Sequence, residues 1–261
     1  MSQVLDQVRE LRAPVDTRPL RVAAGAMLLA VLAVRFGAGP FIEGLRAAGP
    51  WSVAAALVLT ALTTWCCALR WTLVSARLGK PLELRTAYVS YYRSQVLNAT
   101  LPGGVVGDVY RGARHGWKAV LWERGTGQAV QLCLIGTVAL PGEWRWVALA
   151  LLCAVLGAGG LVAVLSALST GGHLLVFLVA ASAVGVTLST GSLIAVGALV
   201  LLGASVPLNI AGWGPREGVA AWAFSAAGST AATGLTVAVA FGVISTLATL
   251  PGLVLLGRRD D

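Results

Sequence analysis

The feature that most constrains this chain is a long stretch that is almost free of charge. Between Arg145 and Arg258 the only Asp, Glu, Lys or Arg residues are Arg216 and Glu217. The whole chain is 57% hydrophobic and 11% charged, whereas a soluble domain has about 25% charged residues. Because a soluble surface needs more charge than this, a soluble enzyme, a nucleic-acid-binding domain and a disordered chain are excluded. The apolar runs also lack the strict alternation of barrel strands, so we expect an all-α integral membrane protein.

The net charge of +8 has a topological explanation. Lys and Arg concentrate in residues 9–21, 70–124 and 258–259, and basic residues collect in the loops that stay in the cytoplasm. We therefore expect a multi-pass protein of the cell (inner or plasma) membrane, with both termini and the central segment cytoplasmic and no nucleic-acid partner. The four cysteines lie in apolar runs without CxxC spacing, so they are interpreted as small hydrophobic residues.

The hydropathy pattern divides the chain into apolar runs joined by short links. A cytoplasmic arm (1–19) and tail (257–261) flank a single transmembrane domain (20–256), and the links 141–146, 169–173 and 189–192 are interpreted as turns between antiparallel neighbours. These features predict a compact bundle of about six to eight transmembrane helices. Some runs are shorter than the roughly 20 residues that a spanning helix needs, so half-membrane helices are expected among them. The runs cover 20–36, 51–76, 126–140, 146–168, 174–189, 192–211, 218–227 and 230–256.

The segment 85–118 interrupts the apolar pattern. It begins as a helix, reaches Asn98, and then meets Pro102, Gly103 and Gly104, which cannot continue a helix. A second helix is predicted from about residue 106. On one helix the polar residues Asp108, Arg111, His115 and Lys118 would form a single stripe, with Arg114 beside it.

The segment 206–218 repeats this design near the end of the chain. An apolar helix ends at Asn209, breaks at Gly212, Gly214 and Pro215, and restarts with Arg216 and Glu217. Gly/Pro-interrupted segments in corresponding positions of two halves are typical of inverted-repeat transporters. A broken helix exposes N–H groups that attract anions, and irregular backbone is tolerated at membrane depth only where it lines a cavity. We expect two re-entrant segments that meet near the bilayer interior, although an ordinary surface loop is the competing interpretation for 85–118.

The two motifs resemble those of a known family. LNATLPGGVVGDVYRG (97–112), the pair Glu123–Arg124 and PLNIAGWGPREG (207–218) are similar to the lysylphosphatidylglycerol synthase transmembrane region, over roughly residues 20–256. The resemblance implies a flippase-type bundle whose re-entrant helices meet in a central cavity and which moves a lipid headgroup between leaflets. No soluble aminoacyl-transfer domain follows residue 256, so we expect the chain not to perform the transferase reaction of a full synthase. The positions carried over by motif are Asn98, Pro102, Gly103, Asp108, Arg111, Arg216 and Glu217.

Catalytic motifs are sparse. The two histidines have no metal-ligand spacing, and neither a GxSxG sequence nor a phosphate-binding loop occurs; His115 is interpreted as a headgroup-level cation partner and His173 as a loop residue. We expect no metal, no cofactor and no enzymatic activity. The leading hypothesis is a flippase for a phospholipid or related anionic lipid that is not driven by ATP and that works beside a separate lipid-synthesising enzyme. The alternative is a membrane enzyme or accessory subunit acting on polyprenyl phosphate or phospholipid.

The proposed headgroup site combines residues of both breaks. Its members are Asn98, Asp108, Arg111, Asn209, Arg216 and Glu217, with helix-break residues Pro102, Gly103, Gly104, Gly212, Gly214 and Pro215 and secondary basic residues Arg70, Arg93, Arg114, His115 and Lys118. Arg70 stays open between a pathway residue and an interfacial one. Because successive helical side chains point about 100° apart, we expect Arg216 and Glu217 not to pair with each other, so that each finds a separate partner or faces water. Arg216 is expected to meet the lipid phosphate and Glu217 to pair with Arg111. The competing interpretation is that both are ordinary interfacial charges at the membrane–water boundary.

Overall fold

The computed structural model describes residues 18–101, 104–206 and 213–256, and every element in these ranges is an α-helix. The predicted arm and tail therefore lie almost wholly outside the described residues. In chain order the helices are α2 (Arg18–Phe36), α3 (Gly39–Ala47), α4 (Pro50–Arg77), α5 (Leu84–Thr100), α6 (Val106–His115), α7 (Trp117–Ala139), α8 (Glu143–Gly159), α9 (Leu161–Val184), α10 (Thr190–Ala204), α11 (Pro215–Ala226), α12 (Ala231–Thr249) and α13 (Pro251–Leu256).

Three stretches of the described chain are long and apolar enough to cross a membrane, judged by length and composition. They are α4, α9 and the α12–α13 stretch from Ala231 to Leu255. Helix α10 is apolar but shorter. An all-helical architecture with such helices agrees with a helical membrane protein. The number of crossings and the re-entrant segments stay predictions.

The core lies where α12 packs against α4, α9 and α11. Phe177 of α9 lies against Phe224 of α11 and Phe241 of α12, with ring centroids 6.5 and 5.9 Å apart. Small residues let the backbones approach closely, as in other membrane bundles. A Cβ at Gly234 of α12, for example, would overlap the backbone of Ala220 in α11.

Two of the predicted boundaries are wrong. The link 169–173 is not a turn, because α9 runs through it, and the chain breaks instead at Gly160, whose φ is 53°. Gly172 sits inside α9 because a Cβ there would overlap the Thr63 side chain of α4, so this glycine serves helix packing. The predicted helix 230–256 stops at Thr249 and restarts at Pro251, since proline cannot donate the next helical hydrogen bond.

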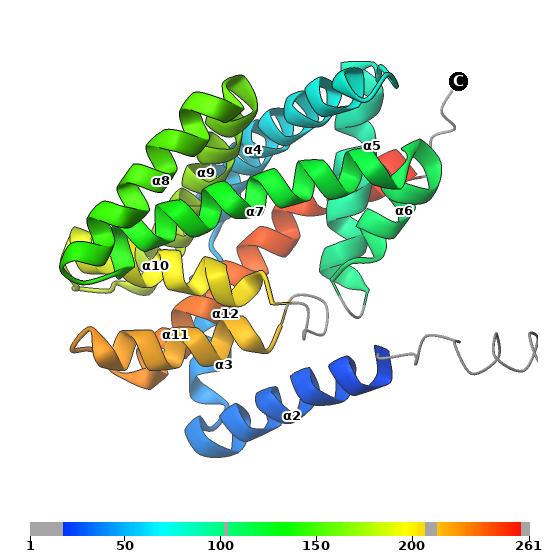
Figure 1. Cartoon of the computed structure of the whole chain (residues 1–261). Helices are drawn as coiled ribbons and strands as arrows, with labels where there is room; N and C mark the ends of the chain where they lie inside the picture. The colour runs from blue at the N-terminus through cyan, green and yellow to red at the C-terminus, as the bar shows by residue number, and fades with distance from the viewer. Residues whose placement is uncertain (1–17, 102–103, 207–212, 257–261) are drawn as a thin grey trace, which may run out of the picture.

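The break-and-restart pattern is confirmed where the structure describes it. Helices α5 and α6 are separated at 101–105, and α11 begins at Pro215. The helix before the second break ends earlier than predicted, because α10 stops at Ala204 and does not reach Asn209; residues 207–212 lie outside the described part of the chain. Figure 1 shows α5 and α6 toward one end of the bundle and α10 and α11 toward the other, with α7 running between them. Helix α7 contacts both α6 and α10, so it connects the two broken regions.

Candidate functional site

At the first break, one side chain joins the two helices. Asn98, near the end of α5, accepts a 2.7 Å hydrogen bond from the backbone N–H of Gly107, and its amide donates to Asp108 at 3.4 Å. Gly104 supplies the turn with a φ of 61°. A Cβ at Gly107 would overlap the Ser94 carbonyl of α5. Asn98 thus satisfies a free N–H at the start of α6, and α6 folds back tightly on α5.

Glu123 of α7 is the centre of a buried ion network. Its side chain is fully buried, and its Oε1 accepts from Arg70 of α4 and from the Tyr91 hydroxyl of α5 at 3.1 Å. Its Oε2 accepts from Arg111 of α6 at 3.3 and 3.4 Å. The carboxylate thus has partners on α4, α5 and α6 and ties four helices together.

A second carboxylate extends the network. Asp108 accepts from Arg111 at 2.7 Å and from the Arg124 Nε at 3.0 Å, with a further contact from the same guanidinium. The Arg111 guanidinium also lies over the rings of Tyr91 and Trp71, 4.0 and 4.9 Å from their centroids. Three arginines thus share two carboxylates, which leaves the network with one unbalanced positive charge.

The second break has a local ion pair. The Glu217 carboxylate accepts the backbone N–H of Gly214 at 2.6 Å and the Nε and Nη2 of Arg216 at 2.8 and 2.5 Å. The Arg216 guanidinium also packs over Trp213 and Phe241, 4.9 and 5.5 Å from the ring centroids. The prediction that Arg216 and Glu217 find separate partners is therefore wrong. The arginine side chain is long enough to fold back onto its neighbour, which the angle between Cβ directions does not reveal.

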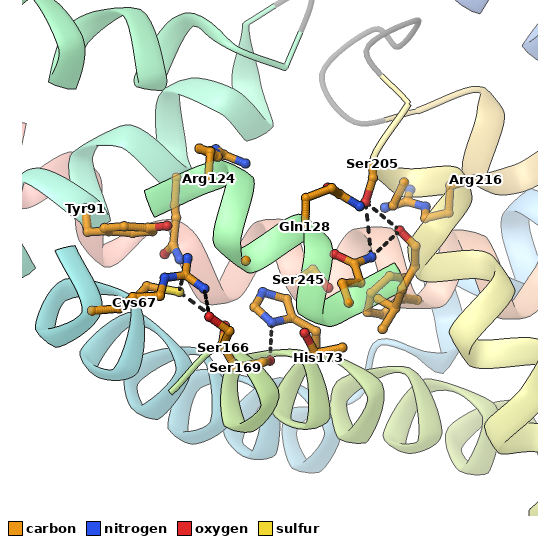
Figure 2. Close-up of a pocket in the computed structure, with 18 residues that line it drawn as sticks. Cys67, Tyr91, Arg124, Gln128, Ser166, Ser169, His173, Ser205, Arg216 and Ser245 are labelled. Atoms are coloured by element: carbon orange, nitrogen blue, oxygen red, sulfur yellow. Dashed lines mark hydrogen bonds between the residues drawn. The ribbon is translucent and has the colours of Figure 1, made fainter. Parts of the chain in front are cut away.

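A polar cavity of about 370 Å³ lies between the two breaks. Figure 2 shows Arg124 on one side, Arg216 on the other, and Gln128, His173 and Ser245 between them. Among the described residues, three arginines and no carboxylate line it; the polar lining residues are Arg70, Arg124, Arg216, Gln95, Gln128, Gln131, Tyr91, Ser166, Ser169, Thr170, Ser205, Ser245, His173 and Cys67. The carboxylates that pair with these arginines lie behind the wall. The cavity therefore offers hydrogen-bond donors and positive charge to an anion.

Two glycines make room for cavity arginines. A Cβ at Gly127 of α7 would come within 2.7 Å of the Arg70 guanidinium, and one at Gly242 of α12 would overlap the Arg216 guanidinium. Neither glycine has a positive φ, so space and not backbone conformation requires them. The two guanidinium positions are thus built into the packing of α7 and α12.

The predicted site residues fall into several groups. Arg70 and Arg216 line the cavity. Asp108 and Glu217 lie outside the lining and pair with the cavity arginines Arg124 and Arg216, and Arg111 pairs with Asp108. Asn98, Gly104, Gly214 and Pro215 lie at the helix breaks. Arg93 donates to the Leu255 carbonyl, Arg114 contacts Tyr110, His115 contacts Ser90, and Lys118 is exposed. Asn209, Pro102, Gly103 and Gly212 lie outside the described residues.

The predicted polar stripe is also interrupted. Gly116, with a φ of 102°, ends α6, so Lys118 belongs to α7 and does not continue the face of Asp108 and Arg111. Arg111 was expected to pair with Glu217. It pairs instead with Glu123 and Asp108.

Several cavity residues were missed by sequence reasoning. His173, interpreted as a loop residue, lies in α9, and Cys67 lies 3.2 Å from the Ser169 hydroxyl on the cavity wall. A signal was present: Arg124, Gln128 and Gln131 recur at helical spacing on α7, as do Ser166, Ser169 and His173 on α9. Such a polar stripe on an apolar helix indicates a face turned toward a cavity or another polar surface.

The described residues contain no group of three or more His, Cys, Asp or Glu side chains that could hold a metal ion.

Comparison with known proteins connects the chain to a family of membrane domains. The family described as the lysylphosphatidylglycerol synthase TM region matches residues 19–170. The match covers more than half of the chain and includes the first break, but it ends before the second. No curated protein and no solved structure matches.

Proposed function

The chain belongs to the lysylphosphatidylglycerol synthase TM region family, and on this premise we propose that it moves a phospholipid or related anionic lipid headgroup between leaflets without ATP. It is a membrane protein from a family connected with membrane lipids. The observation that carries the proposal is the wall of the cavity, in which three guanidinium groups and no described carboxylate face the interior. A polar site of this kind inside an apolar bundle fits the charged headgroup of a lipid whose acyl chains stay in the bilayer.

The phosphate would bind to the cavity arginines. Guanidinium groups grip phosphate oxygens bidentately, and Arg124 is the most accessible of the three, with half of its side chain exposed. Asp108, Glu123 and Glu217 hold the arginines in place when no lipid is present. Arg111 has the same supporting role, because its side chain is fully buried between two carboxylates and two rings. Arg124, and not Arg111 of the predicted headgroup site, is thus the arginine that faces the cavity here.

The lipid would pass when the cavity opens alternately to the two leaflets. In inverted-repeat transporters this exposure comes from one half rocking against the other around a fixed site. The same scheme here requires two re-entrant segments in a bundle of about six to eight crossings. The transport would be passive or coupled to an ion. The basic central segment and both termini would face the cytoplasm at the cell membrane. A separate enzyme that synthesises the lipid would supply it on one side.

The deciding experiment uses purified protein in phosphatidylcholine vesicles that contain a trace of fluorescent phosphatidylglycerol. A membrane-impermeant reductant bleaches the outer leaflet, and ATP is omitted. We expect protein-containing vesicles to lose the protected inner-leaflet signal much faster than empty vesicles, while chromatography recovers the lipid unchanged. The matched control is the double variant Arg216→Gln/Glu217→Gln. It leaves the net charge of the protein unchanged but removes one of the three guanidinium groups that line the cavity.

Two results would overturn the proposal. Bleaching at the rate of protein-free vesicles would exclude translocation of this lipid class. A chemically altered lipid would instead support the enzymatic alternative, because translocation makes and breaks no covalent bond.

A further inference from the structure

The charges of the buried ion network beside the cavity do not cancel. Arg70, Arg111 and Arg124 share the carboxylates of Glu123 and Asp108. Each guanidinium carries one positive charge and each carboxylate one negative charge, so the network keeps one positive charge in excess. Because two of its arginines line the cavity, this excess charge acts on whatever enters there.

The rest of the wall does not balance the excess. Arg216 is paired with Glu217, so the two add no net charge. A proton on His173 would only increase the excess. The internal ranges that lie outside the described residues, 102–103 and 207–212, contain no Asp, Glu, Lys or Arg. A balancing negative charge is therefore available neither from the described wall nor from the two helix breaks.

The excess charge is accessible at Arg124. Half of the Arg124 side chain is exposed, whereas the Arg111 side chain is fully buried. Arg70 also lines the cavity, and its buried Nε has no hydrogen-bond partner among the described residues. Figure 2 shows Arg124 at the edge of the space that faces Gln128. A cavity of about 370 Å³ has ample room for an ion of the size of a water molecule, and its positive potential concentrates anions from the solvent.

This charge has its largest effect when the cavity is closed to water. In an open cavity, water solvates the guanidinium groups. A closed and empty cavity would hold an uncompensated cation inside the bundle, and an unpaired charge in such surroundings is strongly unfavourable. One monovalent anion removes the excess. The phosphate of a bound lipid supplies that anion while the lipid is moved, but the return of the empty protein needs another.

From this charge balance we propose that the cavity has a second ligand, a small inorganic anion such as chloride, which binds at Arg124 when no lipid is present. The binding site follows from the cavity and its charges. Its role rests on the proposed translocation: the anion neutralises the empty cavity, so the protein can close and return without a lipid. Transport is then an exchange of a lipid phosphate for an anion from solution.

Binding is tested without transport, on purified protein in a nonionic detergent. Chloride replaces the bulkier anion gluconate at constant ionic strength, and thermal unfolding is measured. We expect a saturable rise of a few °C in the unfolding temperature, because a ligand of the folded protein stabilises it. Arg124→Gln removes the excess charge and should abolish the rise. Asp108→Asn increases the excess to two charges and should bring saturation to a lower chloride concentration.

The matched control is Arg145→Gln. Arg145 is exposed near the start of α8 and does not line the cavity, so this variant loses the same charge as Arg124→Gln at another place. It should respond to chloride as the wild type does.

The role of the anion is tested in phosphatidylcholine vesicles with a trace of fluorescent phosphatidylglycerol. There most return steps occur without an anionic lipid, and we expect transport in chloride to be about 10-fold or more faster than in gluconate. In vesicles made mainly of phosphatidylglycerol, a lipid can occupy the cavity in both directions. The ratio of the two rates should then fall to about one. Arg124→Gln should show a ratio of about one in both kinds of vesicle.

The possible failures are distinguishable. A wild-type protein whose unfolding ignores chloride, or an Arg124→Gln protein that responds fully, overturns the anion site whatever transport shows. Chloride binding together with equal transport in the two salts overturns the role in the return step. If no lipid moves in either salt, the proposed function fails, and unfolding still decides the anion site. Should Arg124→Gln not fold, an Asp108→Asn protein with the chloride dependence of the wild type overturns the charge argument.

Discussion

The two broken-helix regions have the same sequence design but use their arginines differently. At the first break, Arg111 is fully buried and is held by Asp108, Glu123 and two aromatic rings. At the second, Arg216 has one carboxylate partner, its own neighbour Glu217, and lines the cavity. The other two arginines of the cavity wall come from helices beside the first break, Arg70 from α4 and Arg124 from α7. Similar motifs thus place one arginine in a supporting network and the other on a binding wall.

The largest effect is expected for substitution of Glu123, the centre of the buried ion network. Glu123→Gln leaves Arg70 and Arg111 without their shared carboxylate, and a broken buried ion pair costs about 3–5 kcal/mol. We expect a marked loss of stability in detergent, measured by thermal or denaturant unfolding. Asp108→Asn is the matched control and should cost less, because the Asp108 side chain is 15% exposed. A Glu123→Gln protein as stable as the wild type would mean that this network does not hold the helices together.

The next largest expected effect is a loss of transport caused by substitutions at the second break. Arg216→Gln/Glu217→Gln removes both charges together, so no buried charge is left unpaired, yet one phosphate donor is lost. Hydrogen bonds to charged groups contribute about 1.5–3 kcal/mol, which corresponds to a loss of transport of roughly 10- to 100-fold. Arg216→Lys should restore transport only in part, because an ammonium cannot bind phosphate bidentately. Normal transport by the double variant would move the headgroup site away from Arg216.

A smaller effect is expected when Arg216 is displaced by a substitution that changes no charge. Gly242→Ala forces the Arg216 guanidinium to shift, and overpacking of this kind costs about 1–3 kcal/mol. We expect transport to fall several-fold, but less than in the double variant. Gly127→Ala should act on Arg70 in the same way. Gly157→Ala on α8, where a Cβ meets no atom within 4 Å, should leave both stability and transport unchanged. Equal behaviour of all three variants would contradict the packing argument.

The smallest effect on stability is expected for substitution of Arg124, which lines the cavity beside the buried Arg111. Arg124 is half exposed, and exposed ion pairs contribute at most about 1 kcal/mol. Arg124→Gln should therefore unfold within about 1 kcal/mol of the wild type and still lower transport of an anionic lipid by about 3- to 10-fold. Paired measurements of unfolding and transport on one preparation test this. A large stability loss with unchanged transport would assign Arg124 to the supporting network.

The helical elements followed from local sequence to a large extent. The apolar runs 20–36 and 51–76 became α2 and α4 almost residue for residue, and the helix restarts near 106 and at Pro215 are as expected. The turn predicted at 169–173 failed because glycines on a membrane helix have two uses. They end helices, and they also let helices pack closely, as Gly172 does against Thr63. Only the neighbouring helix distinguishes the two.

The sequence by itself determined that this is a helical membrane chain with two interrupted segments and charged residues beside each interruption. Those properties depend on composition and on local backbone chemistry. The tertiary structure decided which charges meet: it joined Arg70, Arg111 and Glu123 from three helices, kept Arg216 with Glu217, and placed Arg124 and Arg216 in the wall of one cavity. Such partners lie far apart in the chain, and their pairing depends on helix rotation and packing distance. Residue spacing along one helix does not contain that information.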